Sequence, residues 1–338
     1  LDGQSKVTRL VDKAIADGMK GMAITDHGVM FGIKEFSDYC AKINKERKAK
    51  GEEPFKPIFG CEMYVARRSM HDKEKDKHDN SGYHLIVLAK NYNGYKNLIK
   101  LVSHAWVDGY YYKPRTDREE LEKYHEDLIV CSACIAGEVP NKIIRGDIEG
   151  AREACEWYHR VFGDDYYLEL QRHEVKDPTL VANREAYPLQ QKANKVLMQF
   201  AKEYGVKLVC TNDCHFEDKE TAEAHDHLLC LSTNEDLDDP KRMRYSKQEW
   251  FKTRQEMNEV FSDVPEAMAN TLEILDKIES YSIDHGPIMP FFPIPESFGT
   301  EEEWEKKFTE ADLYKEFTTD ENGLNPLSEE EGKKVIAR

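Results

Sequence analysis

The hydrophobic and polar positions of the chain alternate between helical and strand-like patterns. A helix is expected first, with Ser5 as its N-cap residue and apolar positions three or four residues apart at Val7, Leu10, Val11, Ala14 and Ile15. Short apolar runs then predict strands at 21–25, 58–66, 84–89, 127–132, 166–171 and 206–211. Helical patterns lie between most of these runs, most clearly at 184–204, which Gly205 should end. This alternation indicates an α/β fold with a parallel sheet, open or closed into a barrel.

Two features of the pattern concern the limits of the domain. Because the chain opens directly on a helix, we expect the strand that should precede this helix to lie upstream of Leu1. After residue 280, prolines with aromatic residues between them replace the alternation, and acidic helical stretches follow. We therefore expect one domain at 1–280, and at 281–338 a linker and the start of a further segment.

Composition narrows the class of protein. Of the 338 residues 40% are hydrophobic, and no run approaches the roughly 20 apolar residues that a membrane span needs. The amino end lacks the charged and apolar regions of a secretory signal, so we expect a cytoplasmic protein without membrane contact. The eight cysteines lie mostly in apolar patterns, which favours reduced, buried thiols over a disulfide framework.

The net charge of −17 argues against a broad surface for nucleic acid, because phosphate affinity comes from clustered Lys and Arg. Any contact with nucleic acid should therefore be local. The run YYYKPR at 110–115 offers such a contact through Tyr111, Lys113 and Arg115, which could stack on and pair with a single-stranded end. The same run could equally form a packed loop.

Asp/His pairs end two of the predicted strands and suggest a metal site. Asp213 and His215 follow the last predicted strand, and Asp26 and His27 follow the first. Because side chains alternate along a strand, Asp213 and His215 can converge on one cation at the strand's carboxyl end. In a loop such a pair is more often a turn or N-cap device. Two strand ends that carry one are harder to explain in that way.

Further metal-binding side chains lie at or beside other predicted strands. They are Glu62, His84 and either Cys131 or Cys134. At the mouth of a barrel such positions could meet, and with the two Asp/His pairs they are competent ligands for Zn²⁺ or Mn²⁺. Several ions held in this way would suit the hydrolysis of phosphate esters, in which paired metals activate water and stabilise the leaving oxygen.

Four other polar residues are weaker candidates for the metal site. His225 and His227 fall on a predicted helix, where residues two apart point about 200° from each other and cannot share one ion. Arg172 and His173 follow a predicted strand and could either line the same mouth or pack inside the fold.

The short sequence motifs around these residues resemble those of a known family. They are AITDHG at 23–28, FGCEMYV at 59–65, YHLIVLAK at 83–90, CSACIAGE at 131–138 and TNDCHF at 211–216. They resemble the PHP (polymerase and histidinol phosphatase) domain at the amino end of bacterial replicative DNA polymerase III alpha subunits. The match runs in order to about residue 280, and GYKNL at 94–98, KPR at 113–115, LDDPKR at 237–242 and NTLEI at 270–274 resemble that polymerase branch in particular. The resemblance implies a distorted (β/α)7 barrel whose first strand lies upstream of this chain.

The resemblance also implies a set of site residues. The ligands would be Asp2, His27, Glu62, His84, Cys134, Asp213 and His215, with Glu62, Asp213 and His215 in catalytic roles. Asp26 would orient its neighbour from outside the ligand set, and Cys131 would face the core. A redox or zinc-ribbon pair formed by Cys131 and Cys134 is the alternative. The family's His-x-His pair belongs about ten residues before the Leu-Asp-Gly word, so of the three possible Zn²⁺ or Mn²⁺ ions, those that need it are expected to be lost.

The function implied is that of a replicative polymerase module. Its metal site would support 3′→5′ proofreading exonuclease activity, impaired in this chain. Its partners would be a DNA 3′ end, other polymerase domains and replisome subunits, and the chain alone should not synthesise DNA. Two alternatives are a non-catalytic structural or docking module and a free-standing phosphatase of small phosphate monoesters.

Overall fold

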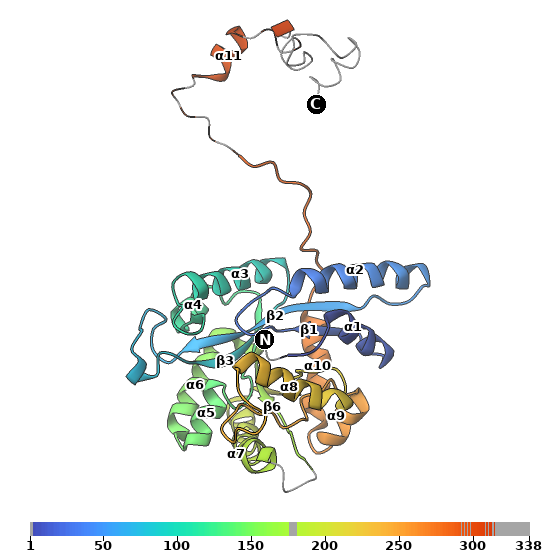
Figure 1. Ribbon diagram of the computed structural model, residues 1–338, viewed down its shortest axis with the longest axis vertical. Coiled ribbons are helices and arrows are strands. Elements are labelled where there is room, and N and C mark those ends of the chain that lie inside the picture. The colour runs from blue at the N-terminus through green and yellow to red at the C-terminus, as the bar shows by residue number, and fades with distance from the viewer. Residues whose placement is uncertain are drawn as a thin grey trace. The chain divides into compact units, whose positions relative to one another are not determined.

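A computed structural model of the chain describes residues 3–175 and 181–291 and, beyond these, 293, 295, 297, 299–307, 309, 311, 312 and 314 (Figure 1). It divides into two compact units, Leu1–Ile283 and Asp284–Arg338. The division falls close to residue 280, where the sequence pattern changes. The candidate site residues belong to the first unit.

The first unit is built on a seven-stranded sheet with the strand order β1-β2-β3-β5-β6-β7, in which β4 pairs with β2. The strands are β1 Gly21–Ile24, β2 Lys56–Ala66, β3 Gly82–Ala89, β4 Arg115–Thr116, β5 Leu128–Cys131, β6 Tyr166–Leu170 and β7 Lys207–Cys210. Each strand predicted from the sequence is present within one or two residues at either end. The two-residue β4 was missed because its pairing with Tyr64 and Val65 leaves no periodic signal.

The sheet is mixed, which corrects the predicted parallel arrangement. β3 runs antiparallel to β2 and to β5, whereas the pairs β1–β2, β5–β6 and β6–β7 are parallel. A parallel pair needs a crossover, usually a helix. The segment between β2 and β3 contains only the short 3₁₀ turn Lys75–Lys77, so these two strands form a long hairpin. The α/β fold is confirmed, with a curled mixed sheet that closes only part of a barrel.

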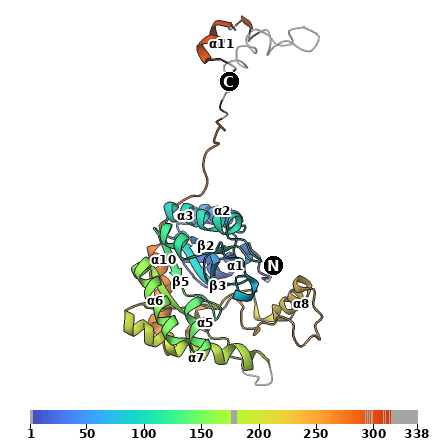
Figure 2. The same ribbon diagram turned by 90° about the vertical axis from the view of Figure 1, so that its left-hand side faces the viewer.

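Helices surround the sheet (Figure 2). In the first unit they are α1 Val7–Ala16, α2 Ile33–Ala49, α3 Tyr92–Val107, α4 Arg118–Lys123, α5 Glu138–Arg145, α6 Ile148–Phe162, α7 Val181–Tyr204, α8 Ala222–Thr233, α9 Arg254–Val260 and α10 Pro265–Lys277. The predicted stop of α7 at Gly205 is confirmed by the left-handed φ of +69° at this residue. The predicted N-cap Ser5 is wrong: Lys6 caps α1, and its N–H donates to Oε1 of Glu217 at 2.8 Å.

The two faces of the sheet carry different side chains. On β2, Cys61, Met63 and Val65 point outward into the main core, which α3, α5, α6 and α7 cover. At one end of the inner face the residues are apolar and pack against α10: Ile58, Leu88, Ile129, Tyr167 and Val209. Further along, the same alternation places Glu62 and His84 on this inner face, because each lies an even number of residues from the apolar inner positions of its strand. The inner face therefore combines an apolar base with a polar end.

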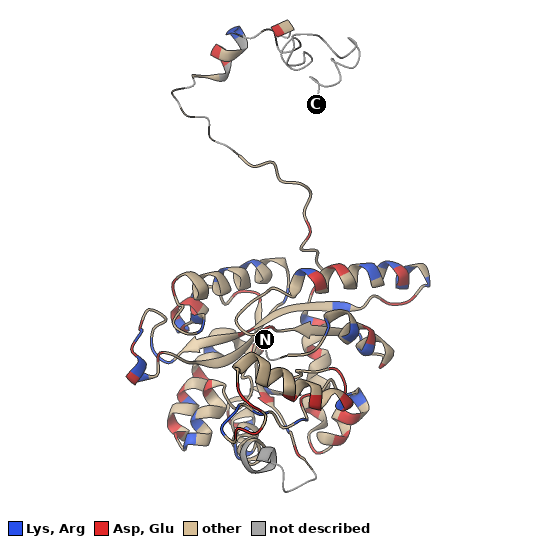
Figure 3. Ribbon diagram, in the orientation of Figure 1, with Lys and Arg blue, Asp and Glu red and all other residues tan. Residues whose placement is uncertain are grey.

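The second unit contains α11 Glu301–Lys307. Before it, Ile288, Met289 and Phe291 are among the most exposed large apolar residues. In the part of the chain that the structure describes, no helix has both the length and the apolar character required to cross a membrane. Both signs of charge are mixed along the helices of the first unit, for example along α2 (Figure 3).

Candidate metal centre

Glu62 lies at the centre of the polar end of the inner face. Its side chain is buried, and its two carboxylate oxygens have different partners. Oε1 lies 2.5 Å from Nδ1 of His84, and Oε2 lies 3.3 Å from Nδ1 of His27. Potential ligand atoms of these three residues all lie within 4.8 Å of one another. Three of the residues expected to bind metal are thus brought together from β2, β3 and the loop after β1.

The backbone around β2 fixes the position of His27. The N–H of Glu62 donates to O of Asp26 at 3.0 Å, and the N–H of Gly28 donates to O of Glu62 at 2.8 Å. Gly28 has a φ of +65°, and a Cβ there would lie 2.8 Å from Cγ of Pro114. Only glycine fits this turn without strain. Asp26 Oδ2 accepts a hydrogen bond from Gly32 N at 3.0 Å, so this oxygen orders the loop before α2; its expected effect on His27 stays a prediction.

Cys134 reaches the same cluster from the loop after β5. Its Sγ lies 3.6 Å from Nδ1 of His84, whose backbone N–H donates to O of Ala136 at 3.1 Å. Cys131 instead lies in the apolar base of the inner face. Burial raises the pKa of both thiols well above the ordinary value, which opposes the reactive thiolate that a redox pair needs. The structure therefore favours separate roles for the two cysteines.

The loop after β7 brings His215 against His27. The two Nε2 atoms lie 3.4 Å apart, and Nδ1 of His215 lies 2.7 Å from O of Asp213. A carbonyl can only accept, so Nδ1 carries the proton and Nε2 presents its lone pair toward His27. Asp213 has a φ of +48°, an uncommon conformation for a residue other than glycine, and such strain often marks functional sites.

Two residues near this cluster were missed by the sequence analysis. The hydroxyl of Tyr245 lies 3.1 Å from Nε2 of His215. Its segment is held in place by the paired contacts of Arg242 with the carboxylate of Asp226, at 2.6 and 2.8 Å. Glu169 is buried on β6, where its Oε2 accepts from the N–H of Ala133 at 3.1 Å. A lone acidic residue within a buried strand was the signal for Glu169, whereas no local pattern distinguishes Tyr245.

The ionisable groups of the site perturb one another. Burial, reinforced by the charge of Glu62, raises the pKa of Asp213 to about 6. Burial also raises the pKa of Glu169 to about 7. Burial acts to raise the pKa of Glu62 as well, but the hydrogen bond with His84 and the neighbouring imidazoles outweigh it and keep this pKa below the ordinary value. Burial alone would lower the pKa of His84, and the bond to Glu62 instead raises it. Both pKa shifts favour an ion pair in which the proton lies on Nδ1 of His84 and faces Oε1 of Glu62, a position that a cation could take.

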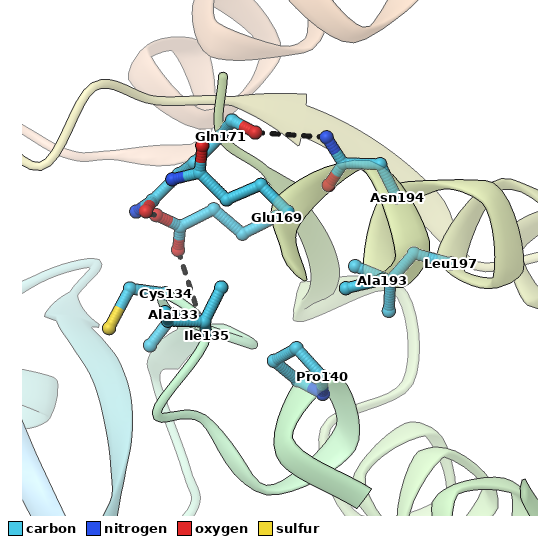
Figure 4. Close-up of a pocket in the computed structure, with 10 residues that line it drawn as sticks. Ala133, Cys134, Ile135, Pro140, Glu169, Gln171, Ala193, Asn194 and Leu197 are labelled. Carbon is cyan, nitrogen blue, oxygen red and sulfur yellow. Dashed lines mark hydrogen bonds between the residues drawn. The ribbon is translucent and has the colours of Figure 1, made fainter. Parts of the chain in front are cut away.

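A small pocket lies behind the Cys134 loop (Figure 4). Its walls include Glu169, Gln171 and Asn194, and the side-chain amide of Asn194 donates to O of Gln171 at 2.9 Å. The sulfur of Cys134 points out of this pocket (Figure 4). The residues that line the pocket therefore pack behind the Cys134 loop, on the side away from the sulfur.

The predicted contacts of 110–115 with DNA need one correction. Arg115 is fully buried, and its guanidinium donates to four main-chain oxygens, those of Gly109, Asp79, Met70 and Asp72. It cannot reach a DNA strand, so its predicted role is wrong. Tyr111 lies over this buried cation, with the guanidinium carbon 5.6 Å from its ring centre. Lys113 is exposed, and its Nζ lies 5.3 Å from the ring centre of Tyr64.

The four polar residues with the weaker predictions make contacts within the fold or lie on its surface. His173 is buried, with Nε2 3.1 Å from O of Asn212, and Arg172 pairs with Asp263 at 2.5 and 2.9 Å. His225 packs its ring 4.9 Å from that of Phe216. His227 is exposed on the same helix, in agreement with the prediction that the two histidines cannot share an ion.

Asp2 lies outside the described residues. The described donors are imidazoles, carboxylates and one thiol around the buried carboxylate of Glu62, a set that fits a divalent transition metal such as Zn²⁺.

Comparisons with known proteins identify the family of the chain. The model of the PHP domain family matches residues 1–173. DNA polymerase III subunit alpha of Borreliella burgdorferi is 40% identical over 94% of this chain and 26% of its own length. The subunits of that name from Treponema pallidum and Thermus aquaticus are 36% and 35% identical over 93% and 94% of this chain, and over 25% of their own length in each case.

The chain thus spans about a quarter of the length of the curated relatives that it matches. A solved structure from Bifidobacterium adolescentis, described as a candidate metal-dependent phosphoesterase, aligns with a TM-score of 0.35 at 13% identity. That alignment covers 63% of this chain and 84% of the other. The family model and the relatives establish that the chain belongs to the PHP domain family and is homologous to part of the DNA polymerase III alpha subunit.

Proposed function

We propose that the chain is the PHP module of a bacterial replicative DNA polymerase and that its inner-face cluster is a metal-dependent phosphodiesterase site acting on DNA 3′ ends. The observation that carries the proposal is the buried carboxylate of Glu62 between two imidazoles, with His215 3.4 Å from one of them. Packing alone does not explain this cluster, because a buried carboxylate is costly without a compensating role. The names of the relatives supply the polymerase context.

The site residues would have two kinds of role, metal binding and the orientation of metal ligands. Six of them would hold one or more Zn²⁺ or Mn²⁺ ions: His27, Glu62, His84, Cys134, Asp213 and His215. A divalent ion held there would activate a water molecule and offset negative charge on the phosphate. Glu62 orients His27 and His84 through its two oxygens, and the carbonyl of Asp213 fixes the tautomer of His215. Burial raises the pKa of the Asp213 carboxyl to about 6, so this group would lose its proton when it binds the ion.

The DNA 3′ end would approach from solvent by a local contact, since the net charge of −17 provides no broad attractive surface. Other polymerase domains and replisome subunits would be the protein partners, and the cytoplasm would be the compartment.

Nuclease activity should depend on Asp213 and His215. We expect Asp213→Asn and His215→Ala to lower the release of nucleotides from a 3′-labelled single strand by about 100-fold or more, because each removes a group from the ion site. His227→Ala, on the exposed face of α8, is the matched control and should retain activity.

The measurement is made with Zn²⁺ or Mn²⁺, with chelator blanks, on the chain and on a form extended upstream to include the expected His-x-His strand. The extended form should be the more active one. Full activity of both variants would contradict the metal-site assignment. Absence of hydrolysis by either form with either metal would replace the catalytic proposal with that of a structural or docking module.

Metal affinity should rise with pH. Ligands must be deprotonated to bind a cation, and the raised pKa of His84 and the pKa of about 6 of Asp213 mean that protons compete with metal near neutrality. We therefore expect binding to strengthen between about pH 5 and pH 8 and to release protons. Titration calorimetry in two buffers of different ionisation enthalpy measures the protons released. An affinity that is independent of pH would show that His84 and Asp213 do not bind the ion.

A further inference from the structure

Two exposed aromatic rings form a flat pair at the end of α3. The rings of Trp106 and Tyr110 stack with centroids 5.4 Å apart and an interplanar angle of 17°. Nearly half of each side chain is exposed, 44% for Trp106 and 47% for Tyr110. Large aromatic residues usually bury more of their surface, so an exposed stacked pair is a feature that requires an explanation.

The pair is fixed directly to the candidate metal centre. The indole N–H of Trp106 donates to O of Gly28 at 2.8 Å. Gly28 follows His27 in sequence, and its own N–H donates to O of Glu62. A single residue thus connects the aromatic pair to a candidate ligand on one side and to the strand of Glu62 on the other. The position of the pair relative to the site is therefore well defined.

An exposed cation lies at the same edge of the site. Nζ of Lys113 lies 5.3 Å from the ring centre of Tyr64. The ring of Tyr64 is 5.2 Å from that of His84 and 6.4 Å from that of His27. Pro114, the next residue, faces Gly28, the residue that accepts from Trp106. The aromatic pair and the cation thus flank the loop that carries His27.

We propose that Trp106, Tyr110 and Lys113 form a binding platform for single-stranded nucleic acid. A base stacks on the aromatic pair and a backbone phosphate pairs with Lys113, so that the 3′ end is directed toward Glu62 and its neighbours. This proposal rests on the proposed function and deepens it, because it names the side chains that would bind the strand and direct its 3′ end to the site.

A nucleic acid strand fits these features better than a protein surface does. Stacking on aromatic rings tolerates any base, since every base has a π-face, and it is regularly combined with a cation that follows the backbone. In a chain with a net charge of −17, one lysine near the site has a large influence on where an anionic strand can lie. The platform replaces the predicted contacts of Arg115, which is buried.

The test is the affinity for a fluorescently labelled oligothymidylate, measured by anisotropy with chelator present so that no hydrolysis occurs. Trp106→Leu and Tyr110→Leu should each weaken binding by roughly 5- to 150-fold, the range for loss of one stacked base. Tyr110→Leu is the more informative variant, because it leaves the bond between Trp106 and Gly28 in place. Trp304→Leu changes another partly exposed tryptophan, in the second unit, and should leave binding unchanged.

Lys113 has a matched control in the same molecule. Nζ of Lys96 lies 5.3 Å from the ring centre of Tyr92, the same distance as that between Nζ of Lys113 and the ring centre of Tyr64. Lys113→Gln should weaken binding and reduce its salt dependence by about one counterion, whereas Lys96→Gln should change neither. Equal effects of the two substitutions would overturn the role of Lys113.

Hydrolysis of a base-free diester, bis-p-nitrophenyl phosphate, separates this proposal from the proposed function. Tyr110→Leu should leave that hydrolysis unchanged while it raises the KM for the oligonucleotide. If oligonucleotide binding depends on Tyr110 but no ester is hydrolysed by the wild-type chain, the platform stands and the catalytic proposal fails. Unchanged oligonucleotide binding by Tyr110→Leu and Trp106→Leu overturns the platform, as does self-association of the chain that these variants abolish.

Discussion

Glu62→Gln is expected to lower the affinity of the chain for Zn²⁺ or Mn²⁺ by about 100-fold or more, since changes that only touch metal ligands from outside already cost about 10- to 100-fold. The substitution keeps the size of the side chain but removes its negative charge. It also places an NH₂ group where an oxygen now faces His27 or His84. Competition with a fluorescent chelator measures the affinity, and circular dichroism checks that the variant is folded.

The chain provides a close control for this substitution. Oε2 of Glu120 lies 2.5 Å from Nδ1 of His104, the same separation as between Glu62 and His84. Among the described residues no third potential ligand joins His104 and Glu120. Glu120→Gln should therefore remove the interaction between this carboxylate and His104 without changing the affinity for metal. If Glu62→Gln and Glu120→Gln bind metal equally well, Glu62 is not a ligand and the inner-face cluster is a buried structural network.

The period-two alternation of the strands explains why much of the site could be predicted. Once 58–66 and 84–89 are identified as strands, Glu62 and His84 must lie on the faces opposite to their apolar neighbours. Asp213 and His215 follow the end of a strand, where a side chain leaves the core and becomes available for chemistry. These placements depend only on local sequence, and the structure brings Glu62, His84 and His215 together with His27.

Residues whose environment depends on distant segments could not be placed in the same way. Tyr245 meets His215 from a segment 30 residues further along the chain, held by the contact of Arg242 with Asp226. The direction of β3 depended on whether its connection to β2 contains a helix, and a charged segment leaves that question open. Trp106 lies on α3, and only its bond to Gly28, 78 residues earlier in the chain, places it beside the site.

Arg115 is fully buried, and its replacement is expected to destabilise the fold. Its guanidinium provides donors to four carbonyl oxygens that come from residues 70–109 and would otherwise lack this partner. Arg115→Ala leaves these acceptors and a cavity in the interior. We expect the free energy of unfolding to fall by about 3 kcal/mol or more, because hydrogen bonds to a charged donor contribute about 1.5–3 kcal/mol each and several are lost together. Urea denaturation followed by tryptophan fluorescence measures the change.

Arg160→Ala is the matched control for this prediction, because Arg160 is exposed and its nearest ion-pair distance, to Glu122, is 3.5 Å. Exposed pairs contribute about 0–1 kcal/mol, so its unfolding should change little. Arg115→Lys distinguishes charge from geometry: a lysine keeps the charge but offers three donors on a single nitrogen in place of a planar fork, so it should recover only part of the loss. If Arg115→Ala instead left stability unchanged and weakened the binding of single-stranded DNA, Arg115 would have to face solvent. The loop that connects β2 to β3 would then have to pack differently from the arrangement in which Arg115 binds the carbonyls of Met70, Asp72 and Asp79.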